Sequence, residues 1–190
     1  MSNKITLIKK ENVMKAYDKA TSAQKELLEN LFGKEMFQPK DITERVKTFE
    51  DAVAILGNDN QAVVDYHALC NTTCTKDILA FAKLRVIVEA LNEGWKPTFR
   101  KDEYRYYLCF RIYSEEEYDN FDEYYKNRCS IVGVSYGNSN AVSRFVYMSV
   151  YDASASLYAN SGSRLSFKTR ELAEYCGMQF FDIWADYLFA

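Results

Sequence analysis

The sequence predicts an α+β fold with a helical N-terminal half, an antiparallel β-sheet of about four strands in residues 101–168 and a long C-terminal amphipathic helix packed on the sheet. Apolar residues recur at helical spacing through much of residues 1–96. Eleven of the fifteen tyrosines lie in residues 101–162, beside many Val, Phe and Ser residues, which favours strands. A helical apolar stripe returns after residue 169. We therefore expect a helical region over 1–96 and a sheet-plus-helix region over 97–190, together forming one compact domain.

Five helices are expected in the first half, with bounds set by capping residues at their starts and by glycines or turn residues at their ends. They are Lys9–Ala20, Ala23–Phe32, Phe49–Leu56, Gln61–Cys70 and Lys76–Glu93. Thr48 and Asp51 form a capping-box-like start for the third of these helices. Gly57 and Gly94 fit the glycine that commonly follows a helix C-terminus.

The second half is expected to contain the strands Tyr104–Tyr113, Ser130–Tyr136, Arg144–Tyr151 and Arg164–Phe167. Between the first two lies Glu115–Arg128, which holds six carboxylates and four aromatic residues and fits either a long loop or an inserted helix. Thr169 is expected to cap a final helix, Arg170–Leu188, whose apolar stripe needs the sheet as its partner.

No catalytic, cofactor or metal motif is recognisable, so we expect a protein that is not an enzyme, has no cofactor and has no metal site. The single histidine, His67, shares a helical stretch with Cys70 and Cys74. A Cys–His nucleophile pair would fit this spacing, but ordinary helix residues are the favoured interpretation. The carboxylates of Glu115–Glu123 lack calcium-loop spacing and favour a solvated acidic face. The five cysteines are odd in number and are interpreted as free thiols.

The segment Ser135–Ser163 is the least ordinary part of the sequence. It contains eight Ser, four Tyr, three Asn and two Gly, a composition close to that of antibody contact loops. An antiparallel sheet with a polar outer face is the alternative. If the strand Arg144–Tyr151 is regular, its tyrosines face outward together. The candidate binding residues are Tyr136, Asn138, Asn140, Tyr147, Tyr151, Tyr158, Arg144 and Arg164.

A basic and aromatic group of residues offers a second kind of contact. Arg144, Arg164, Lys168 and Arg170 lie near aromatic residues in the sequence and would suit single-stranded nucleic acid if they shared a sheet face. The formal net charge of −3 disfavours this interpretation, because proteins that bind phosphates usually carry a basic excess.

Four motifs carry a resemblance to a known family. They are Ile42–Ala52 (ITERVKTFEDA), Leu91–Pro97 (LNEGWKP), Tyr104–Tyr107 (YRYY) and Gly162–Tyr175 (GSRLSFKTRELAEY). With these motifs the chain resembles a group of uncharacterised proteins common in bacteriophages and integrated elements of gut Bacteroidales. The resemblance spans most of the length and implies a phage or mobile-element setting. It assigns no catalytic or binding residue.

These observations predict a non-enzymatic phage-type binding or accessory protein that recognises a macromolecular partner, expected to be a protein, through a Tyr/Ser/Asn-rich β surface. A structural virion or assembly protein, which would form homo-oligomers, and a single-stranded nucleic-acid binder remain alternatives. The first residues lack the apolar region of a signal peptide, and no run of about 18 apolar residues exists for a membrane. We expect the protein in the host cytoplasm or in the virion, with no membrane partner.

Overall fold

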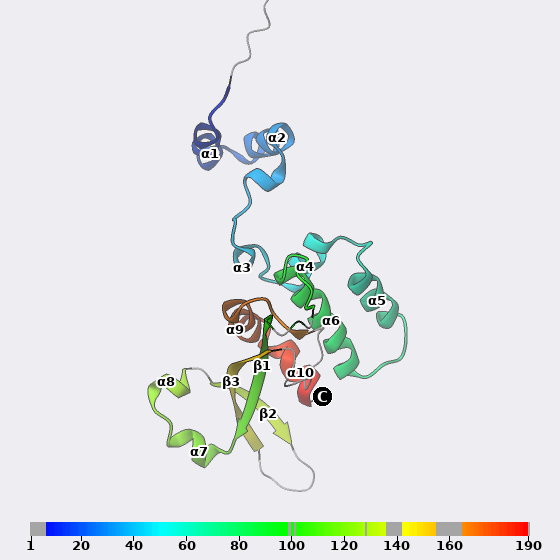
Figure 1. The fold of residues 1–190 in the computed structure, drawn as a ribbon, viewed down its shortest axis with the longest axis vertical. Coiled ribbons are helices and arrows are strands. Elements are labelled where there is room, and N and C mark those ends of the chain that lie inside the picture. Colours follow the sequence, from blue (N-terminus) through cyan, green and yellow to red (C-terminus); the bar gives the residue numbers. More distant parts are fainter. Residues whose placement is uncertain are drawn as a thin grey trace, which may run out of the picture. The chain divides into compact units, whose positions relative to one another are not determined.

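The computed structural model describes residues 7–98, 100, 102–127, 129–135, 142–154 and 165–189. The chain forms two compact units, residues 1–45 and residues 46–190 (Figure 1). The elements of the first unit are α1 (Lys10–Asp18), α2 (Ser22–Phe32), the 3-10 helix η1 (Lys34–Met36) and α3 (Ile42–Arg45).

The second unit combines helices and strands. Its helices are α4 (Phe49–Leu56), α5 (Gln61–Cys70), α6 (Lys76–Leu91), α7 (Glu115–Asp119), α8 (Glu123–Lys126), α9 (Arg170–Gln179) and α10 (Phe181–Phe189). Its strands are β1 (Tyr104–Tyr113), β2 (Cys129–Ser135) and β3 (Val142–Ser154). The bounds of α4, α5 and β1 are those predicted from the sequence.

The first unit buries little apolar surface of its own. Tyr17 of α1 stacks on Phe37 with ring centroids 4.1 Å apart. The Tyr17 hydroxyl donates a hydrogen bond to Glu29 of α2, and this bond raises the pKa of the Tyr17 phenol. Helix α2 contains no buried residue, and its Leu27 and Leu31 are exposed.

Helix α6 is the core helix of the second unit. Eight of its residues are buried, among them Leu84, Ile87 and Leu91, and it contacts α4, α5, α9 and α10. A helix that is apolar around most of its circumference is stable only when neighbours cover it. Gly94, with a φ of 82°, follows the helix and turns the chain away from it.

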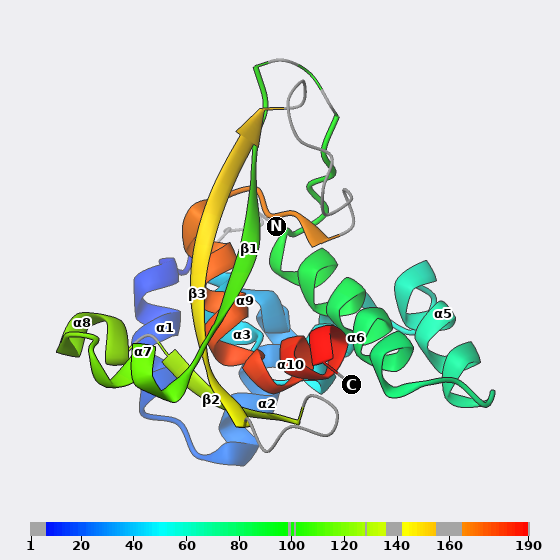
Figure 2. The same ribbon diagram turned by 90° about the horizontal axis from the view of Figure 1, so that it is seen from below.

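The strands form one antiparallel sheet in the order β1–β3–β2, so β3 is the central strand (Figure 2). β1 pairs with β3 along its whole length, from Tyr104 opposite Ser154 to Tyr113 opposite Phe145. The pairing of β2 with β3 shifts register between Ile131 and Val134. The fold thus places the strand that contains Tyr147 between two neighbours.

The predicted α+β fold class is wrong. The structure is mostly helical, with ten α-helices among the described residues, and the strands are a minor part of it. The described part of the predicted strand Arg164–Phe167 makes only an isolated bridge, between Phe167 and Tyr106. The chain leaves β1 directly afterwards because Thr169 caps α9, its hydroxyl accepting the Leu172 N–H at 3.3 Å. The prediction of about four strands is therefore also wrong.

The single long C-terminal helix is a further error of prediction. At Phe180, φ is −114° and ψ is 31°, which ends α9 before α10 begins. The break has a packing reason. Helix α9 packs mainly on β1 and β3, whereas α10 packs mainly on α6, so the break lets the two helices follow different main partners. Trp184 of α10 is buried and lies against Phe110 of β1, with ring centroids 5.5 Å apart.

Candidate interaction surface

The sequence-predicted binding residues fall into two groups. Five lie outside the described residues: Tyr136, Asn138, Asn140, Tyr158 and Arg164. The other three lie on the central strand β3: Arg144, Tyr147 and Tyr151. The structure therefore brings three of the eight onto one strand and leaves the placement of the others as a prediction.

The strand register distinguishes Tyr147 from Tyr151. Tyr147 is paired with Arg111 of β1, and Tyr151 is paired with Tyr107. Residues directly opposite each other in an antiparallel pair lie on the same face of the sheet. Arg111 is exposed, whereas Tyr107 is only 9 % exposed. The two tyrosines are four residues apart and share one face of the sheet, but the β1 neighbour is exposed at position 147 and buried at position 151. We therefore take Tyr147 as the first contact candidate to test.

Strand β1 supplies the described side chains of this sheet. Tyr104 at its start is 58 % exposed, and Phe110 lies against Phe181 of α10 with centroids 6.2 Å apart. Arg105 is 2 % exposed, and its guanidinium carbon lies 6.0 Å from the centroid of the Tyr107 ring. A buried cation over an aromatic face is a favourable arrangement. The sheet therefore holds Tyr107 in place and leaves Tyr104 in solvent.

Part of the basic and aromatic group predicted as a nucleic-acid patch contacts the protein itself. Phe167 is fully buried and cannot stack on a base. The ammonium of Lys168 lies 3.2 Å from the Glu93 carboxylate. The guanidinium carbon of Arg170 lies 5.8 Å from the centroid of the Tyr106 ring. These contacts tie the start of α9 to α6 and β1.

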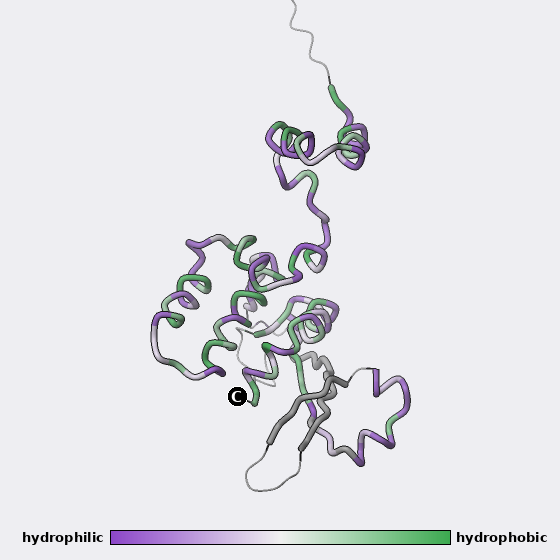
Figure 3. Tube along the Cα trace, turned by 180° about the vertical axis from the view of Figure 1, so that it is seen from behind, coloured by the Kyte–Doolittle hydropathy of each residue, from purple (hydrophilic) through white to green (hydrophobic). Residues whose placement is uncertain are grey.

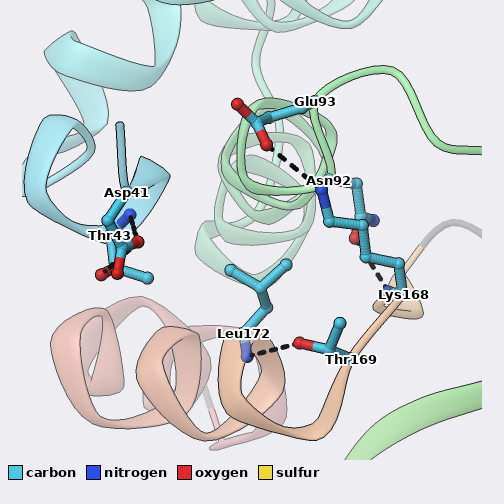
Figure 4. A network of polar contacts seen from close by, with 7 residues as sticks. All are labelled: Asp41, Thr43, Asn92, Glu93, Lys168, Thr169 and Leu172. Atoms are coloured by element: carbon cyan, nitrogen blue, oxygen red, sulfur yellow. Dashed lines mark hydrogen bonds and ion pairs between the residues drawn. The ribbon is translucent and has the colours of Figure 1, made fainter. Parts of the chain in front are cut away.

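A buried amide joins α6 to the segment that follows the tyrosine-rich stretch (Figure 4). Asn92 is 4 % exposed. Its Nδ2 donates to the Ser166 carbonyl at 2.8 Å, and its Oδ1 accepts from the Lys168 backbone N–H at 3.0 Å. The amide thus satisfies two backbone groups that are more than 70 residues away in sequence. Asn92 lies in the motif Leu91–Pro97, but sequence patterns assigned it no role because its partners are distant.

A cavity of about 280 Å³ lies beside this junction. It is lined by Arg85, Val88, Glu89, Asn92, Trp95, Lys96, Pro97 and Ser166. Two of its charged groups already have partners: Arg85 pairs with Asp65 at 2.9 Å, and Glu89 accepts from the Asn60 amide at 2.9 Å. We assign these polar groups to the packing of α5 and α6.

The region around the single histidine is built of ordinary helix contacts. His67 and Cys70 are both exposed on α5. Burial, followed by interaction with Cys70, raises the pKa of the neighbouring Tyr66 phenol to about 12. The Tyr66 ring meets Phe49 edge-on at 4.7 Å. Among the described residues, no three His, Cys, Asp or Glu side chains are close enough to hold a metal ion.

The acidic segment after β1, for which the sequence allowed either a long loop or an inserted helix, contains two short helices, α7 and α8. Ser114 caps α7: its hydroxyl accepts the Glu117 N–H at 3.2 Å, and the Glu117 carboxylate accepts the Ser114 N–H at 2.8 Å. Asp122 caps α8 by accepting the Tyr125 N–H at 3.0 Å. Both motifs are local, so the signals were present in the sequence. This largely hydrophilic part of the chain follows β1 (Figure 3).

The chain matches no protein-family model, no curated protein and no solved structure. Within the described residues, no helix is both long enough and apolar enough to cross a membrane.

Proposed function

We propose that this chain is a non-enzymatic binding or accessory protein of phage type, which recognises a protein partner through tyrosine residues of the sheet centred on β3. The supporting observation is the position of Tyr147. It belongs to the Tyr/Ser/Asn-rich segment Ser135–Ser163 and is paired with the exposed Arg111. The resemblance to proteins of phages and mobile elements supports the setting.

The physical reason for this assignment is the cost of ordering a contact surface. A tyrosine offers a large contact area, apolar on the ring and polar at the hydroxyl, and only two torsions are fixed on binding. Serine and asparagine add hydrogen bonds that adapt to the partner. A protein partner also suits the absence of a basic excess, because the formal net charge is −3.

A pull-down with the full-length protein tests the proposal. Tagged wild type and Tyr147→Ala are incubated with lysate of the phage-infected host, and captured proteins are quantified by mass spectrometry. We expect Tyr147→Ala to lose the main partner while its melting temperature stays close to that of the wild type. Tyrosines are typical energetic anchors of protein interfaces, whereas surface substitutions change stability by only about 0.5 kcal/mol, so the two readouts separate a contact role from a role in packing.

Tyr104→Ala is the matched control. Tyr104 is 58 % exposed and lies on β1, on the opposite face of the sheet from Arg111. The variant should retain the partner. A folded Tyr147→Ala protein that captures the same partners as the wild type would show that this surface is not the binding site.

A further inference from the structure

Strand β1 lies at one edge of the three-stranded sheet, so one side of its backbone faces away from β3. Part of this outer edge is already paired. The Tyr106 N–H donates to the Phe167 carbonyl at 3.1 Å, and the Phe167 N–H donates to the Tyr106 carbonyl at 2.9 Å. The N–H and C=O groups of Tyr106 therefore point away from β3, and the outer edge is able to pair with extended chain.

The alternation of the strand extends this direction to every second residue after Tyr106. β1 pairs with β3 along its whole length without a register shift. In a regular antiparallel ladder, successive residues turn their N–H and C=O groups to opposite sides of the strand. The backbone groups of Leu108, Phe110 and Ile112 therefore also point outward. In the part of the chain that the structure describes, no backbone hydrogen bond reaches these three residues from the outer side.

Helices α9 and α10 pack on a face of the sheet. The side chains of a strand stand roughly perpendicular to the sheet, whereas its hydrogen-bonding groups lie in the plane. The Phe110 ring lies 6.2 Å from the Phe181 ring and 5.5 Å from the Trp184 ring of α10. The Tyr106 ring, on the same face, lies 5.8 Å from the Arg170 guanidinium of α9. These contacts place the helices over a face and not in the hydrogen-bonding direction of the edge.

The sequence of this edge carries few of the features that prevent strand pairing. Exposed edges are commonly protected by proline, by lysine, by a β-bulge or by a very short strand. The stretch Leu108–Ile112 (LCFRI) contains no proline and no lysine, and Arg111 is its one charged residue. Strand β1 has ten residues and a regular register with β3. These features favour the addition of another strand.

We propose that the outer edge of β1 pairs antiparallel with the same edge of a second copy of this chain. The three outward residues are symmetric about Phe110. A twofold axis at Phe110 sets Leu108 opposite Ile112 of the second copy, so every outward N–H and C=O group of the stretch finds a partner. The two sheets, each of three strands, then join into one sheet of six strands.

The charge pattern and the existing bridge both favour a second copy in this register. Arg111 lies opposite Cys109 of the second copy, so like charges do not meet directly across the pair. The bridge between Phe167 and Tyr106 closes the edge on the N-terminal side of Leu108, and the strand ends shortly after the stretch. The proposal concerns the edge of the sheet, whereas the proposed partner surface concerns a face, so either can fail without the other.

Sedimentation velocity of the full-length protein over a wide range of concentration tests the proposal. We expect a reversible monomer–dimer equilibrium. Leu108→Pro removes an outward N–H and leaves the ladder with β3 intact, as an edge strand tolerates. It should weaken dimerisation about tenfold or more, because two hydrogen bonds are lost per dimer.

Leu108→Ala is the matched control, because it shortens the same side chain and keeps the N–H. It should dimerise more tightly than Leu108→Pro, and circular dichroism confirms that both variants are folded. A wild-type protein that stays monomeric at every concentration, or equal weakening by the two variants, would overturn the proposal.

A disulfide tests the register without relying on proline. Arg111→Cys sets a thiol opposite Cys109 of the second copy, where paired Cα atoms lie about 4.5 Å apart, a separation that a disulfide spans. In a Cys70→Ser background, oxidised glutathione should produce a covalent dimer on a non-reducing gel, and adding Cys109→Ser should abolish it. Adding Tyr147→Ala, which alters a face of the sheet, should leave cross-linking unchanged. A covalent dimer that persists with Cys109→Ser would show that the copies meet elsewhere.

Discussion

At the scale of single residues, burial decides which cysteines can react. Cys176 of α9 is fully buried, and this burial raises the pKa of its thiol to about 12. Cys70 of α5 is exposed. The thiolate is the reactive form of cysteine, and a thiol with a raised pKa stays protonated at neutral pH. Burial and protonation therefore both protect Cys176.

We expect iodoacetamide at pH 7.5 to alkylate Cys70 of the native protein and to leave Cys176 unmodified. Peptide mass spectrometry after short labelling times measures the extent at each site. Labelling in denaturant should modify both residues equally, which serves as the control. Rapid native modification of Cys176 would show that α9 does not stay packed on the strands.

At the scale of elements, α4 shows how a charged cap links stability to pH. The Asp51 carboxylate accepts the backbone N–H groups of Thr48 at 2.9 Å and Lys47 at 3.0 Å. These bonds lower the pKa of the Asp51 carboxyl below its ordinary value of 3.8. A carboxyl whose pKa is lower in the folded state stabilises the fold above the unfolded-state pKa, and this stabilisation disappears as the pH falls through the folded-state pKa.

The variant Asp51→Asn should reduce the free energy of unfolding at neutral pH by about 0.5–1 kcal/mol, the usual range for a weakened helix cap. Its stability should also fall less than that of the wild type below about pH 4, because the titrating group is gone. Urea denaturation across this pH range measures both effects. Asp59→Asn, at an exposed turn position, removes the same charge and should keep the acid-dependent loss.

The strands show which element-level features the sequence predicts. Composition and turn residues place β1 correctly and locate most of β2 and β3. They do not reveal that Arg164–Phe167 contributes only one bridge, because pairing depends on the path into α9. They likewise miss the break at Phe180, since the residues around it continue a helical apolar pattern.

At the scale of the whole molecule, Asn92 connects parts of the chain that are distant in sequence. Its side-chain amide makes hydrogen bonds with the backbone of Ser166 and Lys168. Asn92 directly follows α6, which contains much of the buried core. A buried backbone group that loses its partner costs about 1–3 kcal/mol. The Asn92 amide therefore supplies two of the bonds that hold residues 165–169 against α6.

We predict that Asn92→Ala lowers the free energy of unfolding by about 2–4 kcal/mol, because the Ser166 carbonyl and the Lys168 N–H both lose their bonds. Chemical denaturation followed by tryptophan fluorescence measures this change. The neighbouring variant Glu93→Gln removes a surface ion pair with Lys168 and should change stability by less than about 1 kcal/mol. A similar small effect for Asn92→Ala would show that the junction does not carry stability.

The candidate binding residues were predicted from composition, and the structure ranks two of them. The amino-acid composition of Ser135–Ser163 gives no reason to prefer Tyr147 over Tyr151 as a contact residue. The register does, because it sets one beside the exposed Arg111 and the other beside the buried Tyr107. The neighbours that the register supplies belong to β1, which lies outside Ser135–Ser163, so the composition of that segment does not reveal them.

By itself, the sequence determined the features that depend on neighbours within a few positions: the cap at Thr48, the cap at Thr169 and the bounds of α4, α5 and β1. The tertiary structure decided that β3 is the central strand and that two C-terminal helices occur where one was expected. It also decided that the Asn92 amide forms a hydrogen bond with the Ser166 carbonyl, more than 70 residues away in sequence. Caps and periodicity arise from local hydrogen bonds and side-chain spacing, whereas strand order and buried junctions arise from contacts that form only when distant segments pack together.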